Sequence, residues 1–243
     1  MNAMFVLWKR EIKKAFAKKF VLLLEILLIV GVVILLKMVN KANFFKGVDY
    51  ATFFAPGIVA LAIAAYSLTS GWNVIEEKAS GMLRELMVLP VSRRDMFMGK
   101  VAGIATVILL KVFLITLVLS FLVKFHIASY FLLVVFVALL ILLFTSMGVL
   151  FSYLFGHKEA YRIVATFLVL YIYFFSGIFV PLQTSFMLIF SLANPLTYGA
   201  DGLRYAMIKV SQFNPIADFF VLLAILFVVM WVGIAILKKE VIK

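Results

Sequence analysis

The sequence predicts an all-α membrane protein that crosses the bilayer six times, as a single domain over residues 1–243. Hydrophobic residues make up 66% of the chain and charged residues only 14%, with a mean hydropathy of +1.20. A soluble domain is closer to half apolar and a quarter charged, so one water-soluble core cannot hide this much apolar surface. Apolar stretches recur along the chain, each near the ~20 residues that a spanning helix needs.

The composition also excludes several kinds of chemistry. The chain has no cysteine, which removes disulfides, thiolate nucleophiles and zinc–cysteine sites. Its two histidines, His126 and His157, are far apart in the sequence, so we predict no metal site. The net charge of +12 fits basic loops facing anionic lipid better than it fits nucleic acid. We therefore expect membrane lipid as a partner and no nucleic acid.

Residues 1–19 predict a basic amphipathic helix in the cytoplasmic interface of the membrane. Apolar residues recur at helical spacing among lysines and an arginine: Phe5, Trp8, Ile12 and Phe16. A basic cluster that only fixes topology shares most of these residues and stays open as an alternative. No small-x-small cleavage site follows, so we interpret the segment as retained rather than as a removed signal peptide.

Six apolar stretches of the chain predict the membrane spans. Glu25 lies within the first stretch and Lys111 within the third, whereas the second and fourth carry no charge. The predicted spans are residues 20–39, 50–75, 100–123, 127–155, 161–181 and 216–237.

The charge-free stretch that contains the fifth span is too long for one helix. Residues 163–200 cover 38 positions, and such a helix would measure about 57 Å at ~1.5 Å per residue, against a hydrocarbon core of ~30 Å. Pro181 and Pro195 are the predicted interruptions, because proline lacks an amide donor and clashes inside a helix. We expect the outer segment, residues 182–212, to form short helices at the outer surface or to dip into the membrane and return.

The distribution of basic residues predicts which side of the membrane each loop faces. With six spans, sixteen lysines and arginines fall on the side of the two termini and six on the other side. Because cytoplasmic loops carry the excess of basic residues, both termini and the segment 76–99 are predicted to be cytoplasmic, in a multi-pass protein of the cell membrane.

The charged segment 76–99 is predicted to fold as two helices separated by a tight break. Pro90 ends the first helix, and Ser92 followed by Asp95 is typical of the start of a second. Apolar residues share one face of the first helix: Met82, Leu83, Leu86 and Met87. That face favours a docking element, since methionine adapts to a partner's groove. An ordinary cytoplasmic loop is the alternative.

Four stretches, in order, resemble the membrane permease subunits of type-2 ATP-binding-cassette (ABC) exporters. They are DYATFFAPGIVALAI at 49–63, EEKASGMLRELMVLPVSRRDMFMGK at 76–100, FFSGIFVPL at 174–182 and NPLTYGADGLRY at 194–205. The ordered set, rather than any single motif, carries the resemblance.

The resemblance implies one half of an ATP-driven pump. Permeases of that family pair as dimers, of identical or related chains, and bind two separate ATPase subunits. Their segment between spans two and three contains the coupling helix that docks on the ATPase, which in this chain falls at 76–94. The residues assigned to docking are Glu76, Glu77, Gly81, Arg84, Glu85, Pro90, Arg93 and Arg94.

The chain itself lacks a Gly-x-x-x-x-Gly-Lys-[Ser/Thr] phosphate loop. We therefore expect a transport subunit with no catalytic residues and no bound cofactor, with ATP and magnesium held by the partner ATPase. The substrate would be lipid-like, polysaccharide or drug-like.

Two other functions are the alternatives. A lipid-modifying membrane enzyme needs paired carboxylates or a His and a Ser at one membrane face. An energy-independent channel needs a polar stripe along a span.

Five candidate residues from the family-like stretches lie in or next to the outer segment: Pro181, Asn194, Pro195, Asp201 and Arg204. Asp201 and Arg204 are three residues apart, the spacing of an ion pair on one helix. We favour a structural role for this pair over a role in gating the substrate.

Small residues in span two, GIVALAIAAYSLTSG at 57–71, predict that this span approaches a neighbouring helix closely. A role in lining a channel fits the same pattern.

Lys111 lies near the middle of span three. A central lysine costs ~2.5–3.5 kcal/mol, but each flanking Leu, Ile, Phe or Val returns ~0.3–0.6 kcal/mol, so the span still inserts. Glu25 in span one is the charged candidate at similar depth. Three roles stay open: a structural Lys111–Glu25 pair, which we favour, a place on the substrate path or dimer interface, and snorkelling through a water defect.

Replacing Lys111 with methionine separates these roles. If the lysine only pairs with Glu25, we expect K111M to lower the yield of assembled protein, and transport to fall only in proportion. Size-exclusion profiles and substrate flux measure the two quantities. Transport lost from a variant that assembles normally would contradict a purely structural pair.

Overall fold

The computed structural model describes residues 8–10, 12–13, 19–38, 45–80, 93–123, 127–155, 158–182 and 185–240. All regular elements in these ranges are helices, and the one β-type contact there is an isolated bridge between Phe45 and Val48. The predicted all-α class is confirmed. The helices are α2 (Lys19–Met38), α3 (Tyr50–Ala79), α5 (Arg93–Val123), α6 (Tyr130–Leu154), α7 (Lys158–Phe174), α8 (Ser185–Leu192), α9 (Pro195–Ile208) and α10 (Pro215–Glu240).

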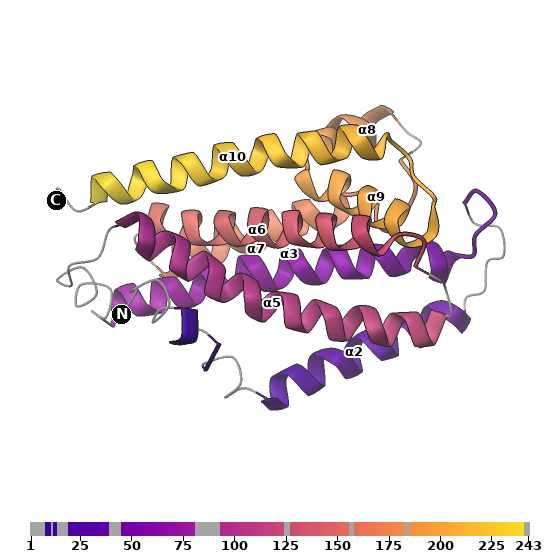
Figure 1. The fold of residues 1–243 in the computed structure, drawn as a ribbon, viewed down its shortest axis with the longest axis horizontal. Coiled ribbons are helices and arrows are strands. Elements are labelled where there is room, and N and C mark those ends of the chain that lie inside the picture. Colours follow the sequence, from indigo (N-terminus) through magenta and orange to yellow (C-terminus); the bar gives the residue numbers. More distant parts are fainter. Residues whose placement is uncertain are drawn as a thin grey trace.

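The long helices α2, α3, α5, α6, α7 and α10 run alternately in opposite directions (Figure 1). The last turn of α3, the start of α5 and the end of α10 lie at one end of the bundle. The turn at 45–48, α8 and α9 lie at the other. Segments that the charge pattern assigns to opposite sides of the membrane are thus at opposite ends of the molecule.

Four helices within the described ranges are long and apolar enough to cross a membrane. They are Tyr50–Glu76, Met98–Val123, Tyr130–Leu154 and Pro215–Ile236, which correspond to predicted spans two, three, four and six. Predicted spans one and five correspond to α2, of 20 residues, and α7, of 17 residues. The chain is a multi-pass membrane protein, and six stays the predicted number of crossings.

The helix of predicted span five ends earlier than the range 161–181. α7 stops at Phe174, and residues 175–180 form a turn and bends. Gly177 has a φ of +65°, a left-handed conformation that glycine adopts without a steric penalty. The Ser176 hydroxyl donates to the Tyr173 carbonyl oxygen at 3.0 Å. The chain therefore leaves the helix at this Ser–Gly pair, before Pro181 is reached.

In the centre of the bundle, α3 and α6 cross in close contact. A Cβ atom added to Gly148 on α6 would lie 2.5 Å from the Ser67 carbonyl oxygen on α3. A Cβ atom on Gly71 would overlap the Gly148 carbonyl and the Tyr161 hydroxyl. That hydroxyl donates to the Leu68 carbonyl oxygen at 2.6 Å. The small residues of span two thus permit the close approach that they predict, and the neighbour is α6.

Two short helices, α8 and α9, connect α7 to α10. With 14 residues, α9 is about 21 Å long at ~1.5 Å per residue, too short to span the membrane. It packs against α3, α6 and α10, and most of its residues are buried. Gly199 and Gly202 allow the contact with α6, because a Cβ atom at either would overlap Leu140 or Phe136. The outer segment therefore seats one helix inside the end of the bundle.

We expect Gly148→Ala to destabilise the protein, because the added methyl group has backbone atoms of α3 on one side and nowhere to move. Overpacking of this kind typically costs ~1–3 kcal/mol. Gly31→Ala in α2 is the matched control. Its Cβ atom would meet nothing within 4 Å, so the better helix propensity of alanine should leave stability equal or raise it by ~0.5–1 kcal/mol.

Thermal unfolding of both variants in detergent measures the difference. Equal midpoints for the two variants would contradict the tight α3–α6 crossing.

Candidate functional site

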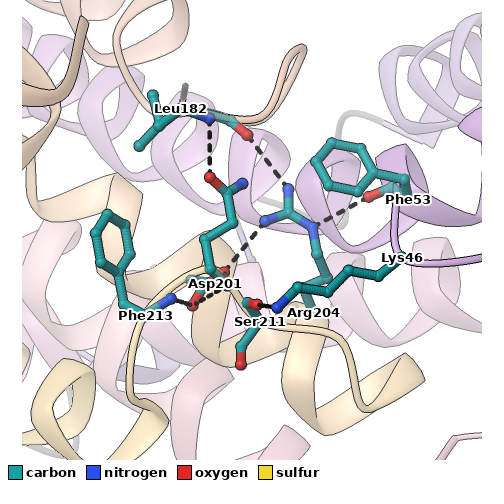
Figure 2. Close-up of polar contacts among 9 residues, drawn as sticks. Lys46, Phe53, Leu182, Asp201, Arg204, Ser211 and Phe213 are labelled. Atoms are coloured by element: carbon teal, nitrogen blue, oxygen red, sulfur yellow. Dashed lines mark hydrogen bonds and ion pairs between the residues drawn. The ribbon is translucent and has the colours of Figure 1, made fainter. Parts of the chain in front are cut away.

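A buried polar network centred on Arg204 lies at the end of the bundle that carries α9 (Figure 2). Arg204 is 1% exposed. Its Nε donates to the Phe53 carbonyl oxygen at 3.3 Å, and its Nη2 donates to the Gly177 carbonyl oxygen at 3.4 Å. The guanidinium carbon also lies 4.0 Å from the centroid of the Phe53 ring, a cation–π contact. Arg204 thus joins α9 to the start of α3 and to the chain that follows α7.

Asp201 is the ionic partner of Arg204 and holds the chain that follows α9. Its Oδ1 accepts from Arg204 Nη1 at 3.4 Å. Its two oxygens also accept the backbone N–H of Gln212, at 2.8 and 3.0 Å, and Oδ2 accepts that of Phe213 at 2.9 Å. The side chain of Gln212 in turn accepts the Leu182 N–H at 2.9 Å. The structure brings Asp201 and Arg204 together as their spacing predicts.

A tight turn at residues 45–48 packs onto the same network. Lys46 and Gly47 both have positive φ angles, 48° and 85°. The Lys46 ammonium group donates to the Ser211 carbonyl oxygen at 2.5 Å, and the Phe45 ring makes an edge contact with the Phe53 ring at 5.3 Å. The network therefore connects the α2–α3 turn, the start of α3, the chain after α7, α9 and the α9–α10 connection.

Burial has the largest effect on the pKa values of Asp201 and Arg204. It raises the pKa of the Asp201 carboxyl above its ordinary value, although the backbone N–H groups of Phe213 and Gln212 and the charge of Arg204 act in the opposite direction. Burial likewise lowers the pKa of Arg204 to about 10, against the favourable charge of Asp201. The guanidinium is therefore still charged at neutral pH.

The other residues predicted in the outer segment fix the start of α9. Asn194 caps the helix: its Oδ1 accepts the Leu196 N–H at 3.0 Å, while its Nδ2 donates to the Ile172 carbonyl oxygen of α7 at 3.0 Å. Pro195 occupies the first helical position, where its missing N–H costs nothing. Pro181 is buried and precedes Leu182, which bonds to Gln212.

The residues predicted to dock on an ATPase lie at the opposite end of α3. Glu76 is exposed in the last turns of α3, where its Oε1 accepts from Trp72 Nε1 at 2.9 Å. Glu77 also belongs to α3, and Arg93 and Arg94 are the first two residues of α5. The other docking predictions lie outside the described residues: Gly81, Arg84, Glu85 and Pro90.

The intramembrane lysine contacts an aromatic ring. Lys111 Nζ lies 4.1 Å from the centroid of the Tyr66 ring, which links α5 to α3 inside the bilayer. Glu25 is on α2, which packs against α5, but its side chain is outside the described residues. The Lys111–Glu25 pair therefore stays a prediction.

The sequence reasoning missed several members of the network. The Phe53 and Gly177 carbonyl groups carry no signal in a sequence, since any residue has a carbonyl. Gln212 sits in an unpatterned connection. A further residue, Asp218, was also missed: it is buried in the first turn of α10, where a lone acid at the start of the last span is a visible signal.

The structure is that of a polytopic membrane domain. Its apolar helices are long enough to span a membrane, and the buried Asp201–Arg204 pair links several of its segments at one end. The described residues also include no group of three or more side chains able to hold a metal. A comparison with protein families finds that the ABC-2 type transporter family matches residues 2–208, which is most of the chain. The chain belongs to this family, whose members are membrane permease subunits of ABC transporters, and the resemblance seen in the sequence is confirmed. A search of curated proteins finds no match.

We expect Arg204→Met to destabilise the protein strongly, because it leaves the Asp201 carboxylate buried without its cation. Breaking a buried pair in this way costs ~3–5 kcal/mol. Lys209→Met is the control: this exposed cation lies at the C-terminal end of α9 and should change stability by less than ~0.5 kcal/mol.

The double variant D201N/R204M should recover part of the loss, because it removes both charges. Thermal unfolding in detergent compares the three proteins. A midpoint for R204M as high as that for K209M would show that the buried pair does not hold α9.

Proposed function

We propose that this permease is the membrane half of an ATP-driven exporter that moves a lipid-like, polysaccharide or drug-like substrate out of the cytoplasm. It works as a dimer of permease chains, identical or related, with two separate ATPase subunits. Each ATPase docks on the segment 76–94. Membership of the ABC-2 type transporter family supports the partnership with an ABC ATPase, and the lack of a phosphate loop in this chain supports a motor on another polypeptide.

The single observation that carries the mechanism is the position of α3. This helix runs without a break from the Arg204 network at Phe53 to the docking residue Glu76. Its 30 residues measure about 45 Å at ~1.5 Å per residue, longer than the ~30 Å hydrocarbon core. A displacement of its docking end is thus transmitted along the hydrogen-bonded helix as far as Pro56, next to the turn that contains Phe53.

Pro56 gives α3 a weak point next to the network. A proline inside a helix removes one i→i−4 hydrogen bond, here the bond to the carbonyl of Thr52. The first turn of α3, which contains Phe53, can therefore shift relative to the rest of the helix. In the proposed cycle, closure of the ATPases moves the segment 76–94, α3 moves with it, and the contact between Phe53 and Arg204 changes as the two sides of the membrane are exposed in turn.

The outer surfaces of the bundle fit lipid and a second permease copy. Large apolar side chains are exposed along α5, α7 and α10, among them Phe113, Phe121, Phe167, Phe227 and Trp231. Asp201 and Asp218 do not offer an exposed carboxylate pair for the enzyme alternative, because each is only 1% exposed.

Cross-linking tests the docking surface directly, and the absence of cysteine from the sequence makes each introduced cysteine unique. We expect Glu76→Cys to form a cross-link with a co-expressed ABC ATPase, with a yield that changes when ATP is added. Glu159→Cys is a same-end control in the first turn of α7, also exposed, and should cross-link less. Lys46→Cys, at the opposite end of the bundle, should not cross-link.

Failure of Glu76→Cys to trap any nucleotide-hydrolysing subunit would contradict the docking proposal. So would labelling of Glu76→Cys from outside intact cells, because it would place this end of the bundle on the wrong side of the membrane.

A further inference from the structure

Asp218 is a second buried acid at the end of the bundle that carries α9. It lies in the first turn of α10, where its backbone N–H donates to the Asn214 carbonyl oxygen at 3.0 Å. Its side chain is 1% exposed. Neither carboxyl oxygen has a hydrogen-bond donor within the part of the chain that the structure describes. A buried carboxylate without donors is unfavourable, so this group calls for an explanation.

Asp218 lies in the neighbourhood of Asp201, because α10 packs against α9 and Asp201 accepts the N–H of Phe213, just before α10 begins. The charge of Asp201 acts on the Asp218 carboxyl group across this contact. Three donors at this end of the bundle are used on Asp201, which accepts from Gln212, Phe213 and Arg204. Two ionised carboxylates in contact repel each other. One proton held between them removes a charge and converts the contact into a hydrogen bond.

The charged and titratable groups around Asp218 do not offer a second cation among the described residues. On α9 these groups are Asp201, Arg204 and the phenol of Tyr198. Neither α6 nor residues 112–123 of α5 contain a charged side chain. Lys46 reaches the nearby connection, where its ammonium group binds the Ser211 carbonyl. Lys124 and His126 lie outside the described residues.

The N-terminus of α10 is the one feature that favours an ionised Asp218. The helix dipole stabilises an anion in the first turn. That effect is small for a single exposed charge, and here it opposes both complete burial and a neighbouring carboxylate. Two carboxylates facing one guanidinium would leave a net negative charge out of contact with water, and binding a proton brings the three groups to neutrality.

We propose that Asp201 and Asp218 form a proton-binding carboxyl pair that joins α9 to α10. Asp201 stays ionised, because it accepts three donors. Asp218 takes up one proton from water and keeps it, and its O–H donates a hydrogen bond to an Asp201 oxygen. Release of that proton restores repulsion between the two helices and loosens the seat of α9. The pair does not depend on the transport cycle proposed above.

Infrared spectroscopy of the full-length chain in lipid nanodiscs tests the protonation directly. At neutral pH the wild type should show the C=O stretching band of a protonated carboxylic acid, which shifts in heavy water, and Asp218→Asn should lose it. Glu159→Gln removes a matched acid, also in the first turn of a helix but exposed, and should keep the band. Asp218→Glu should retain a band of the same type.

A pH series gives a second readout. Because the folded protein binds a proton that the unfolded chain releases, the thermal midpoint of the wild type should fall as the pH rises from mildly acidic to mildly alkaline values. Asp218→Asn mimics the protonated state and should fall less over the same range, while Glu159→Gln should follow the wild type.

Two results would overturn the proposal. The first is a wild-type spectrum without the band of a protonated carboxylic acid. This test needs only the wild type, so it remains decisive even if Asp218→Asn does not fold. The second is a thermal midpoint that does not depend on pH but rises when sodium or calcium is added at alkaline pH, in the wild type and not in Asp218→Asn. That result would make the pair a metal-cation site.

Discussion

A guanidinium buried in a membrane protein must find all of its hydrogen-bond partners within the protein, because lipid offers none. Arg204 meets this requirement with two backbone carbonyls, one carboxylate and one aromatic ring. These partners belong to three residues: Asp201 on α9 itself, Phe53 at the start of α3, which supplies both a carbonyl and the ring, and Gly177 after α7. The need to satisfy one side chain therefore fixes the positions of α9, the start of α3 and the chain after α7 together. The close contacts of Gly199 and Gly202 with α6 complete that seat.

The same helix that supplies Phe53 to this network carries Glu76 in its last turns, at the opposite end of the bundle. Along its length, α3 meets α6 through Ser67, Gly71 and Gly148, with no room for larger side chains. A helix that is packed this closely moves as a rigid body together with its neighbours and does not bend freely between its two ends. The exception is the proline in its second turn, which lies next to Phe53. The architecture thus combines a stiff central helix with a softer joint near the buried arginine.

The helical class, the order of the long helices and the Asp201–Arg204 spacing could all be predicted from the sequence, because each depends on local composition or on the period of a helix. The end of α7 was placed too late: a Ser–Gly pair in a left-handed turn ends it at Phe174, and proline was the more visible signal. The carbonyls around Arg204, the role of Gln212 and the contact of Lys111 with Tyr66 could not be predicted. They depend on how distant segments pack, and backbone groups are present at every position.

The early end of α7 has a consequence for the surrounding lipid. Its 17 helical residues measure about 26 Å at ~1.5 Å per residue, less than the ~30 Å thickness of a typical hydrocarbon core. A hydrophobic helix shorter than the bilayer is accommodated by local thinning, by snorkelling of the flanking side chains or by packing against another protein chain. The flank of the protein beside α7 is thus where the two headgroup layers are drawn closest together, or where a second chain replaces the lipid.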